Sequence, residues 1–225
     1  IQMIKLKSNY EKTLLILSGL IIFSFFYGFT IGEDSLGGAK HDYIFHEKYF
    51  TMFADDFQNT INNYGNNQEV RNSPLFYILF SKLVKLGFTN TDLKYFNLVI
   101  IFPLIFFFFK SIKIKYKEIS LVSQIILTST ILLSPTIRSL VSYPYPLLWA
   151  ISFFLISIYF FLKFENSEKK EKKYSNAFFC VLNLAIASYF TPNFSVFILF
   201  YGYKFFLEFK LSKNDTAWWI PAFSY

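Results

Sequence analysis

Charged side chains are scarce in this chain. Asp, Glu, Lys and Arg make up 16% of its 225 residues, whereas apolar residues make up 54% and Phe alone occurs 32 times. A soluble protein of this length carries about 25% charged residues. The composition therefore argues against soluble domains and predicts a membrane protein.

Cysteine is almost absent as well. The single cysteine, Cys180, lies within an apolar run, so neither a disulfide framework nor a cysteine-based metal site is possible within the chain. We expect it to be a small buried hydrophobic residue. Nucleic-acid binding is disfavoured despite the net charge of +7, because the basic residues stand in short blocks between apolar runs. The positive-inside rule explains such blocks without a nucleic-acid partner.

The apolar runs predict an all-α fold, a polytopic bundle of transmembrane helices with about six spans and the start of a seventh. We interpret residues 1–225 as a single transmembrane domain. Its expected parts are a first span at 13–31, an outer loop at 32–94, five further spans within 95–207 (95–109, 119–133, 147–164, 177–190 and 194–207) and the start of a further span at 214–225. No cleavage site follows the first run, so we expect an uncleaved helix.

Lysine distinguishes the two sides of this layout. The lysine-dense segments 1–12, 110–117, 163–173 and 204–213 all fall on the side of the N-terminus. The positive-inside rule therefore predicts a cytoplasmic N-terminus and an outer loop on the opposite face. Because the chain begins at Ile1 and stops without a closing polar tail, we expect an N-terminal fragment of a longer protein.

The outer loop contains two expected helices. Residues 42–57 show helical spacing of apolar side chains. Further on, Ser73-Pro74 has the form of a helix start and leads into Leu75–Leu86. This second segment is too short to cross a bilayer, so we expect it to lie at the membrane interface.

The start of the outer loop carries the candidate chemistry. Asp42 and His46 are four residues apart and share one face of a helix. A carboxylate there could take a proton from an acceptor hydroxyl or bind a cation, while His46 could orient it or contact a phosphate. Alternatively both are solvated, with Asp42 capping the helix. No metal site is predicted, because His41 and His46 should point to different faces, although a divalent cation remains possible.

Three short segments resemble a known family. His41-Asp42-Tyr43-Ile44-Phe45-His46 resembles the acidic segment that eukaryotic lipid-linked-oligosaccharide glucosyltransferases carry after their first span. Asn72-Ser73-Pro74-Leu75-Phe76-Tyr77 resembles the start of the second interfacial helix, and Ser134-Pro135-Thr136-Ile137-Arg138 resembles a bacterial pattern in which an arginine faces a lipid phosphate. Together with the order of spans and loop, these segments resemble the GT-C class of integral-membrane glycosyltransferases.

The resemblance implies an inverting hexosyltransferase that takes a sugar from a polyprenyl-phosphate-linked donor. Asp42 would be the catalytic base. Arg138, His46, Lys40 and His41 would bind substrate, Arg138 through the lipid phosphate; alternatively, Arg138 is a helix-end residue that reaches towards water. The acceptor would be a lipid, glycan or protein at the outer face of a bacterial inner membrane. The resemblance implies no certain cofactor.

Other functions stay open. A transporter or flippase subunit for lipid-linked glycans should show an internal repeat, and we see none. We find no ionisable residue well inside a span, which weakens a coupled-transporter interpretation; Gln124 and Asn183 there are expected to hydrogen-bond between helices. A polysaccharide polymerase would carry its large outer loop later in the chain. The resemblance also has a departure, because the turn at 189–193 lacks the basic residues that family members often have there.

Overall fold

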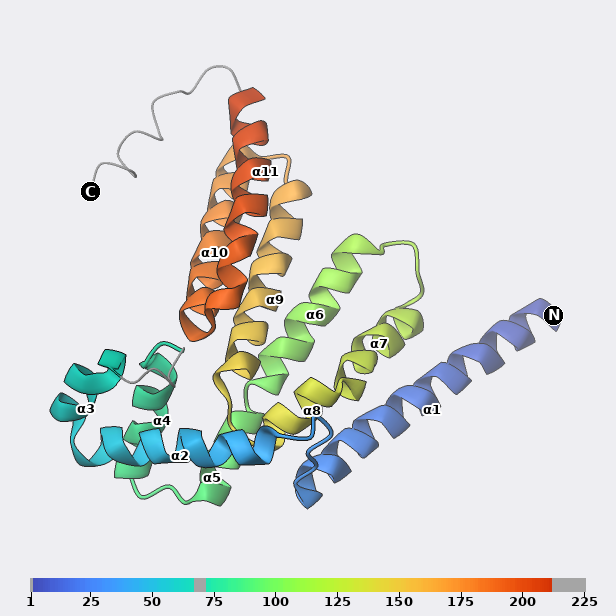
Figure 1. The fold of residues 1–225 in the computed structure, drawn as a ribbon. Helices are drawn as coiled ribbons and strands as arrows, with labels where there is room; N and C mark the ends of the chain where they lie inside the picture. Colours follow the sequence, from blue (N-terminus) through green and yellow to red (C-terminus); the bar gives the residue numbers. More distant parts are fainter. Residues whose placement is uncertain (1, 67–71, 212–225) are drawn as a thin grey trace.

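The computed structural model describes residues 2–66 and 72–211, which form helices and contain no strand. The all-α fold class is therefore confirmed (Figure 1). In order, the helices are α1 (Gln2–Ile31), α2 (Ala39–Asp55), α3 (Phe57–Asn63), α4 (Leu75–Lys85), α5 (Asn90–Leu98), α6 (Ile101–Lys115), α7 (Leu121–Ser129), α8 (Pro135–Ser142), α9 (Pro146–Glu165), α10 (Lys170–Phe190) and α11 (Phe197–Leu211). Three 3₁₀ turns join them: η1 (Tyr64–Asn66), η2 (Thr130–Leu133) and η3 (Pro192–Val196).

Three segments of the described residues are long and apolar enough to cross a membrane, namely Asn9–Ile31, Asn90–Lys115 and Pro146–Glu165. A fourth crossing is present if Leu121–Leu133 and Pro135–Ser142 form one span, bent by 63°. The bend follows from Pro135 at the first position of α8, because a proline has no N–H to continue the preceding helix. The chain thus has the apolar helices of a membrane protein.

The predicted spans at 13–31, 95–109 and 147–164 fall within these three segments. The span predicted at 177–190 lies in α10, and the one predicted at 194–207 begins in η3 and continues in α11; neither helix is among the candidate spans. The first turn of α10 is fully charged, and α11 has 15 residues. The prediction of about six spans is therefore not confirmed by the length and composition of the described helices. The start of a further span expected at 214–225 lies outside the described residues.

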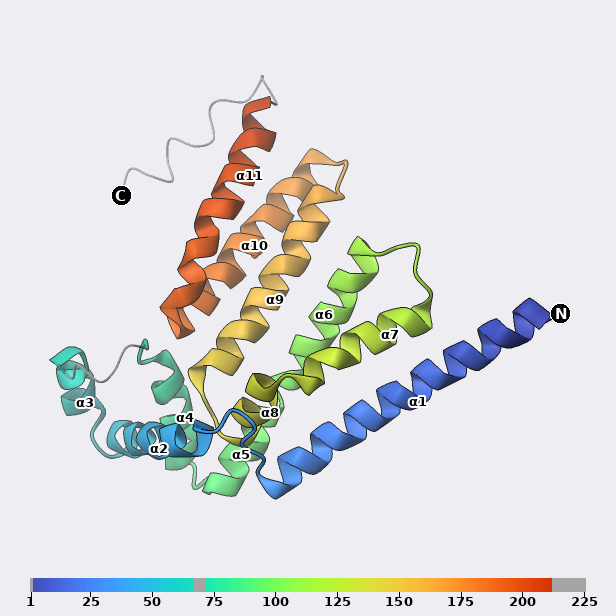
Figure 2. The same cartoon turned by 45° about the vertical axis from the view of Figure 1, so that its right-hand side comes forward.

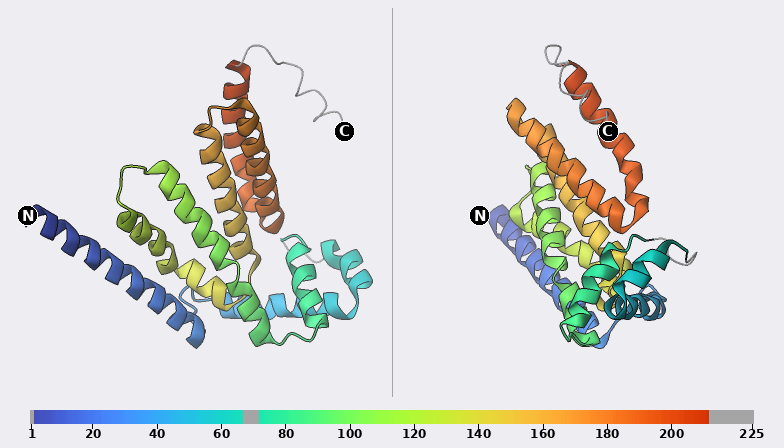
Figure 3. Two further views of the ribbon diagram at one scale, coloured as in Figure 1. Left: turned by 180° about the vertical axis from the view of Figure 1, so that it is seen from behind. Right: turned by 90° about the vertical axis from the view of Figure 1, so that its left-hand side faces the viewer.

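The long helices are tilted relative to one another and come close together near one end of the bundle. α9 packs against both α6 and α10, whereas α1 packs along α7 and diverges from the others (Figures 1 and 2). Near one end, α2 crosses the bundle, with α3, α4 and α5 beside it; the turns at 116–120 and 166–169 lie at the other end (Figure 3). Helices α2–α5 and the lysine-dense turns are thus on opposite ends of the bundle.

Aromatic packing fixes the position of α2. Its residues Tyr49, Phe50 and Phe53 are buried against α4. The phenyl rings of Phe50 and Phe80 stack with their centroids 4.9 Å apart. Tyr49 and Phe53 belong to the apolar stripe that predicts a helix over 42–57, whereas Met52 of the same stripe is exposed. The helix itself runs from Ala39 to Asp55. Because α4 also meets α9 and α10 through Trp149 and Phe190, the cluster holds α2 against the long helices.

Two polar residues inside the helices differ in the bonds they make. Gln124 on α7 donates to the carbonyl of Tyr116, the residue that caps α6, and to that of Ile119, so it joins neighbouring helices as expected. Asn183 donates to Phe179 within α10, and the expectation of a bond between helices is wrong for it. Asn97 on α5, for which no such bond is expected from the sequence, also bonds to other helices.

Candidate functional site

The loop between α1 and α2 determines how α2 begins. The carboxylate of Asp34 accepts backbone N–H groups of Gly37, Ala39 and Lys40 at 3.1–3.2 Å. Burial works to raise the pKa of Asp34, but these backbone hydrogen bonds outweigh it and lower the pKa. The N-cap residue of α2 is Gly38, so Asp34, from the preceding loop, accepts the first N–H groups of α2. This is the structural role that the sequence allows for Asp42.

Asp42 and His46 lie on successive turns of α2 and face the same cavity. Its volume is about 770 Å³, within the range of about 300–1,000 Å³ typical of small-molecule sites. Its wall comprises His41, Asp42, Phe45, His46, Asn72, Tyr77, Tyr145, Leu147, Thr191, Pro192 and Asn193. His41 and His46, expected on different faces, both contribute to it. Segments from α2, α4, the start of α9 and the end of α10 thus meet here.

His46 is the buried member of the pair, with 3% of its surface exposed. Its Nδ1 lies 2.8 Å from the Tyr77 hydroxyl, and Tyr145 packs edge-on with ring centroids 4.4 Å apart. Burial lowers the pKa of His46 to about 4, because desolvation disfavours the imidazolium. At neutral pH His46 is therefore uncharged, and one ring nitrogen donates a hydrogen bond while the other accepts.

Asp42 is exposed, and its carboxylate has no hydrogen bond or ion pair with any described residue. The charge of Asp42 nevertheless affects a neighbouring side chain. The pKa of Tyr145 is raised by burial and further by the charge of Asp42, so the two groups are close. Most other acids of the loop have a structural partner: Glu33, Asp34, Glu47, Asp56 and Asp92. Glu69 lies outside the described residues.

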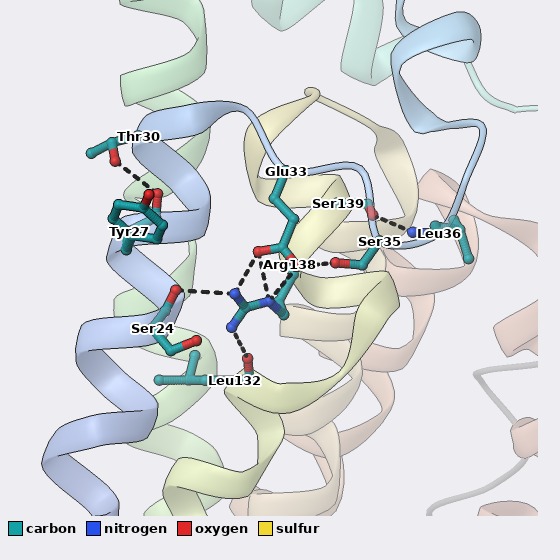
Figure 4. Close-up of polar contacts among 9 residues, drawn as sticks. All are labelled: Ser24, Tyr27, Thr30, Glu33, Ser35, Leu36, Leu132, Arg138 and Ser139. Atoms are coloured by element: carbon teal, nitrogen blue, oxygen red, sulfur yellow. Dashed lines mark hydrogen bonds and ion pairs between the residues drawn. The ribbon is translucent and has the colours of Figure 1, made fainter.

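Arg138 lies elsewhere: it is a residue of α8, and its side chain reaches the end of α1 (Figure 4). Its Nε is 2.9 Å from both carboxylate oxygens of Glu33, and Nη2 also contacts that carboxylate. Nη2 additionally donates to the carbonyl of Ser24 at 3.0 Å. The hydrogen bond from Arg138 holds the pKa of Glu33 below its usual value. This ion pair joins residues that are distant in the sequence, and the sequence does not predict it.

A glycine-ended helix brings Glu33 to Arg138. Gly32, at φ 67°, terminates α1; its N–H donates to Phe29, and the N–H of Glu33 donates back to the carbonyl of Gly28. This is the Schellman arrangement, and it folds Glu33 over Gly28. A Cβ on Gly28 would lie 1.9 Å from a Glu33 carboxylate oxygen and 2.7 Å from Arg138 Nη2. The absence of a side chain at residue 28 leaves the space that the ion pair occupies.

The cavity unites part of the predicted site. Asp42, His46 and His41 lie in its wall, whereas Lys40 is exposed outside it and Arg138 is bound to Glu33. No group of three or more His, Cys, Asp or Glu residues close enough to hold a metal occurs in the described part of the chain. Comparison with known protein families, curated proteins and solved structures finds no match. The geometry of the site therefore carries the functional argument.

Sequence reasoning did not assign Tyr145, Asn72, Thr191 and Asn193 to the site. All four line the cavity and come from three separate segments. In the sequence, Thr191-Pro192-Asn193 marks a break between apolar runs, and Tyr143-Pro144-Tyr145-Pro146 marks a short turn. Nothing in either segment indicates which face of the bundle it joins, because that depends on how α9 and α10 pack on α4.

Proposed function

We propose that this chain is part of a GT-C-type membrane glycosyltransferase. It would move a hexosyl group from a polyprenyl-phosphate-linked donor to an acceptor hydroxyl at the non-cytoplasmic membrane face. The observation that carries the proposal is the state of Asp42: its carboxylate has no structural partner among the residues that the structure describes, and it lies in the wall of a cavity large enough for a sugar. A general base needs a free carboxylate within reach of substrate.

The proposed step is a single displacement. The acceptor oxygen forms a bond to the anomeric carbon of the donor sugar while its proton passes to the Asp42 carboxylate. The bond between the anomeric carbon and the phosphate oxygen breaks, and the lipid phosphate leaves with the bonding electrons. Inversion at the anomeric carbon follows from attack opposite to the leaving group.

Cationic side chains would stabilise the leaving phosphate. Arg138 can offer two parallel N–H groups to phosphate oxygens, but in the structure it donates them to the Glu33 carboxylate. A phosphate at Arg138 would therefore share or displace the Glu33 carboxylate. His46, uncharged at neutral pH, would contribute hydrogen bonding within the cavity and no positive charge. Lys40 and His41 complete the proposed substrate contacts.

The proposed arrangement in the membrane keeps about six spans, a cytoplasmic N-terminus and a bacterial inner membrane. The lysine-dense turns at the end of the bundle opposite α2 and α4 support this orientation. In it, α2 and α4 would lie at the outer interface, with the cavity open to the periplasm and the acceptor. No metal is required by the proposal.

The test is sugar transfer from polyprenyl-phosphate donors in membranes that hold the full-length protein. Asp42→Asn removes the charge at constant size, and Asp55→Asn is the matched control, since Asp55 is an exposed α2 carboxylate outside the cavity wall. We expect loss of transfer at equal protein level in Asp42→Asn alone. Transfer that persists in Asp42→Asn removes the assignment of the base. No transfer by the wild type would favour the transporter, flippase or polymerase alternatives.

A further inference from the structure

Thr191 is an unusual residue in the cavity wall. It ends α10 and precedes η3, and 8% of its surface is exposed. Threonine at such a position ordinarily accepts an N–H of the following helix, yet the Thr191 side chain makes no capping bond. Its Oγ1 is buried without a hydrogen-bond partner among the described residues. Buried hydroxyls are generally satisfied, so this one requires an explanation.

The neighbours of Thr191 in the wall are polar and uncharged. Asn193 follows it across Pro192 and is exposed, and Asn72 faces the same cavity from the loop before α4. An amide both donates and accepts hydrogen bonds, as does a hydroxyl. The aromatic side chains of Phe45 and Tyr145 supply apolar surface beside these groups. Such a wall, apolar rings with a few convergent donors and acceptors, is suited to a hydroxyl-rich ring.

The charges of the cavity select against anions. Asp42 places a negative charge in the wall, and a like charge nearby would be repelled. His46 offers no compensating positive charge at neutral pH, and no lysine or arginine is among the described residues that line the cavity. The basic groups Lys40 and Arg138 lie outside it. Within the part of the chain that the structure describes, a phosphate would therefore meet Asp42 and no lysine or arginine, whereas a neutral polyol has hydrogen-bonding partners on several sides.

We infer that the cavity beside α2 binds an uncharged saccharide and that the turn Thr191-Pro192-Asn193 recognises its hydroxyl groups. In this arrangement the ligand meets the exposed Asn193 amide directly. Thr191 Oγ1, which is buried in the structure, becomes its partner when the Thr191 side chain rotates towards the cavity, and a further ligand hydroxyl approaches Asp42. That the saccharide is the acceptor of the transfer rests on the proposed function. With the acceptor in this cavity, the phosphate of the donor would lie outside the cavity.

The experiment measures binding, so that it is independent of transfer. Full-length protein in nanodiscs is titrated with neutral methyl glycosides of glucose, galactose and mannose, followed by saturation-transfer NMR. Thr191→Val is isosteric and removes a hydroxyl that has no hydrogen-bond partner among the described residues, so the fold should be at least as stable as before. We expect it to weaken binding by about 2- to 12-fold, the range for loss of one hydrogen bond. Asn193→Ala should act in the same direction, and Thr191→Ser should retain binding.

Ser142→Ala is the matched control. Ser142 Oγ is also buried without a partner in the described residues, but Ser142 does not line the cavity. Its removal should leave binding unchanged. Equal binding by wild type and Thr191→Val would show that the hydroxyl meets water alone and would overturn the inference. So would tighter binding of glucuronate than of methyl glucoside, or no binding of any neutral glycoside.

The two proposals fail in different ways. Saccharide binding that depends on Thr191, without transfer from any donor, would keep the inference and remove the glycosyltransferase. Transfer that depends on Asp42, with an acceptor KM unchanged in Thr191→Val and Asn193→Ala, would keep the glycosyltransferase and overturn the assignment of the turn. The thermal unfolding midpoint of each variant is measured in parallel.

Discussion

The guanidinium of Arg138 and the carboxylate of Glu33 form a bidentate ion pair directly above Gly28. Arg138 Nε is 2.9 Å from both Glu33 oxygens, and the nearest atom to a hypothetical Cβ on Gly28 is one of those oxygens. The side chains of Arg138 and Glu33 are 12% and 26% exposed. The two residues are 105 positions apart in the chain. Their ion pair connects α8 to the end of α1 and so fixes where the loop after α1 starts.

Gly28→Ala should therefore destabilise the protein. Its methyl group occupies the space of the ion pair, and we expect a loss of about 1–3 kcal/mol in stability, allowing for the partial exposure of both charges. Gly19→Ala is the control in the same helix, since no atom lies within 4 Å of the added Cβ. Thermal unfolding in detergent micelles should show a lower midpoint for Gly28→Ala alone. Equal midpoints for the two variants would mean that Arg138 and Glu33 shift to accommodate the methyl group without loss of stability.

Separate variants of Arg138 and Glu33 distinguish a role in donor binding from a role in the stability of the fold. Arg138→Gln should lower stability and, if Arg138 contacts the donor phosphate, should raise the KM for donor. Glu33→Gln also weakens the ion pair, but it leaves the guanidinium free for phosphate, so the donor KM should stay constant or fall. A parallel change of KM in both variants would assign to Arg138 a role in holding α8 and α1 together and none in binding donor.

His46 makes stability depend on pH. Burial lowers its pKa to about 4 from an ordinary value of 6.5, so between these values the unfolded chain binds a proton that the folded protein excludes. Stability should fall as pH decreases through this window, by roughly 3 kcal/mol in all. His46→Asn should reduce the dependence, while His41→Asn, which alters an exposed side chain, should retain it. The midpoint of thermal unfolding measured from pH 7.5 to pH 4 tests this.

Asn97 connects three helices. It is fully buried, donates to the carbonyls of Leu140 and Val141 at 2.8 and 3.2 Å, and accepts from Trp149 Nε1 at 2.9 Å. Asn97→Ala leaves these groups unpaired and should destabilise the protein by roughly 2–4 kcal/mol. Asn62→Ala removes an exposed amide of α3 and should change stability little. Denaturation of the two variants in the same micelles compares them; similar values would contradict the role of Asn97.

The sequence alone predicts the helical class, the position of the most apolar spans and the common side of the lysine-dense turns. These features depend on local hydrophobicity and charge, which each segment carries by itself. The same local pattern predicts that Asp42 and His46 share a face, since four residues make about one helical turn. The span count is less well predicted. α10 begins with a fully charged turn and α11 has 15 residues, and a single proline, Pro135, bends another apolar run.

Contacts between distant segments depend on the tertiary structure. Glu33 meets Arg138 because a Schellman turn folds the chain back over Gly28, and the register between α1 and α8 is set by side-chain packing along both helices. Thr191 and Asn193 join Asp42 because α10 ends where α4 and the start of α9 leave a cavity. No local pattern encodes that meeting point. The sequence determines which helices form and which side chains share a face, while packing decides which of those faces meet.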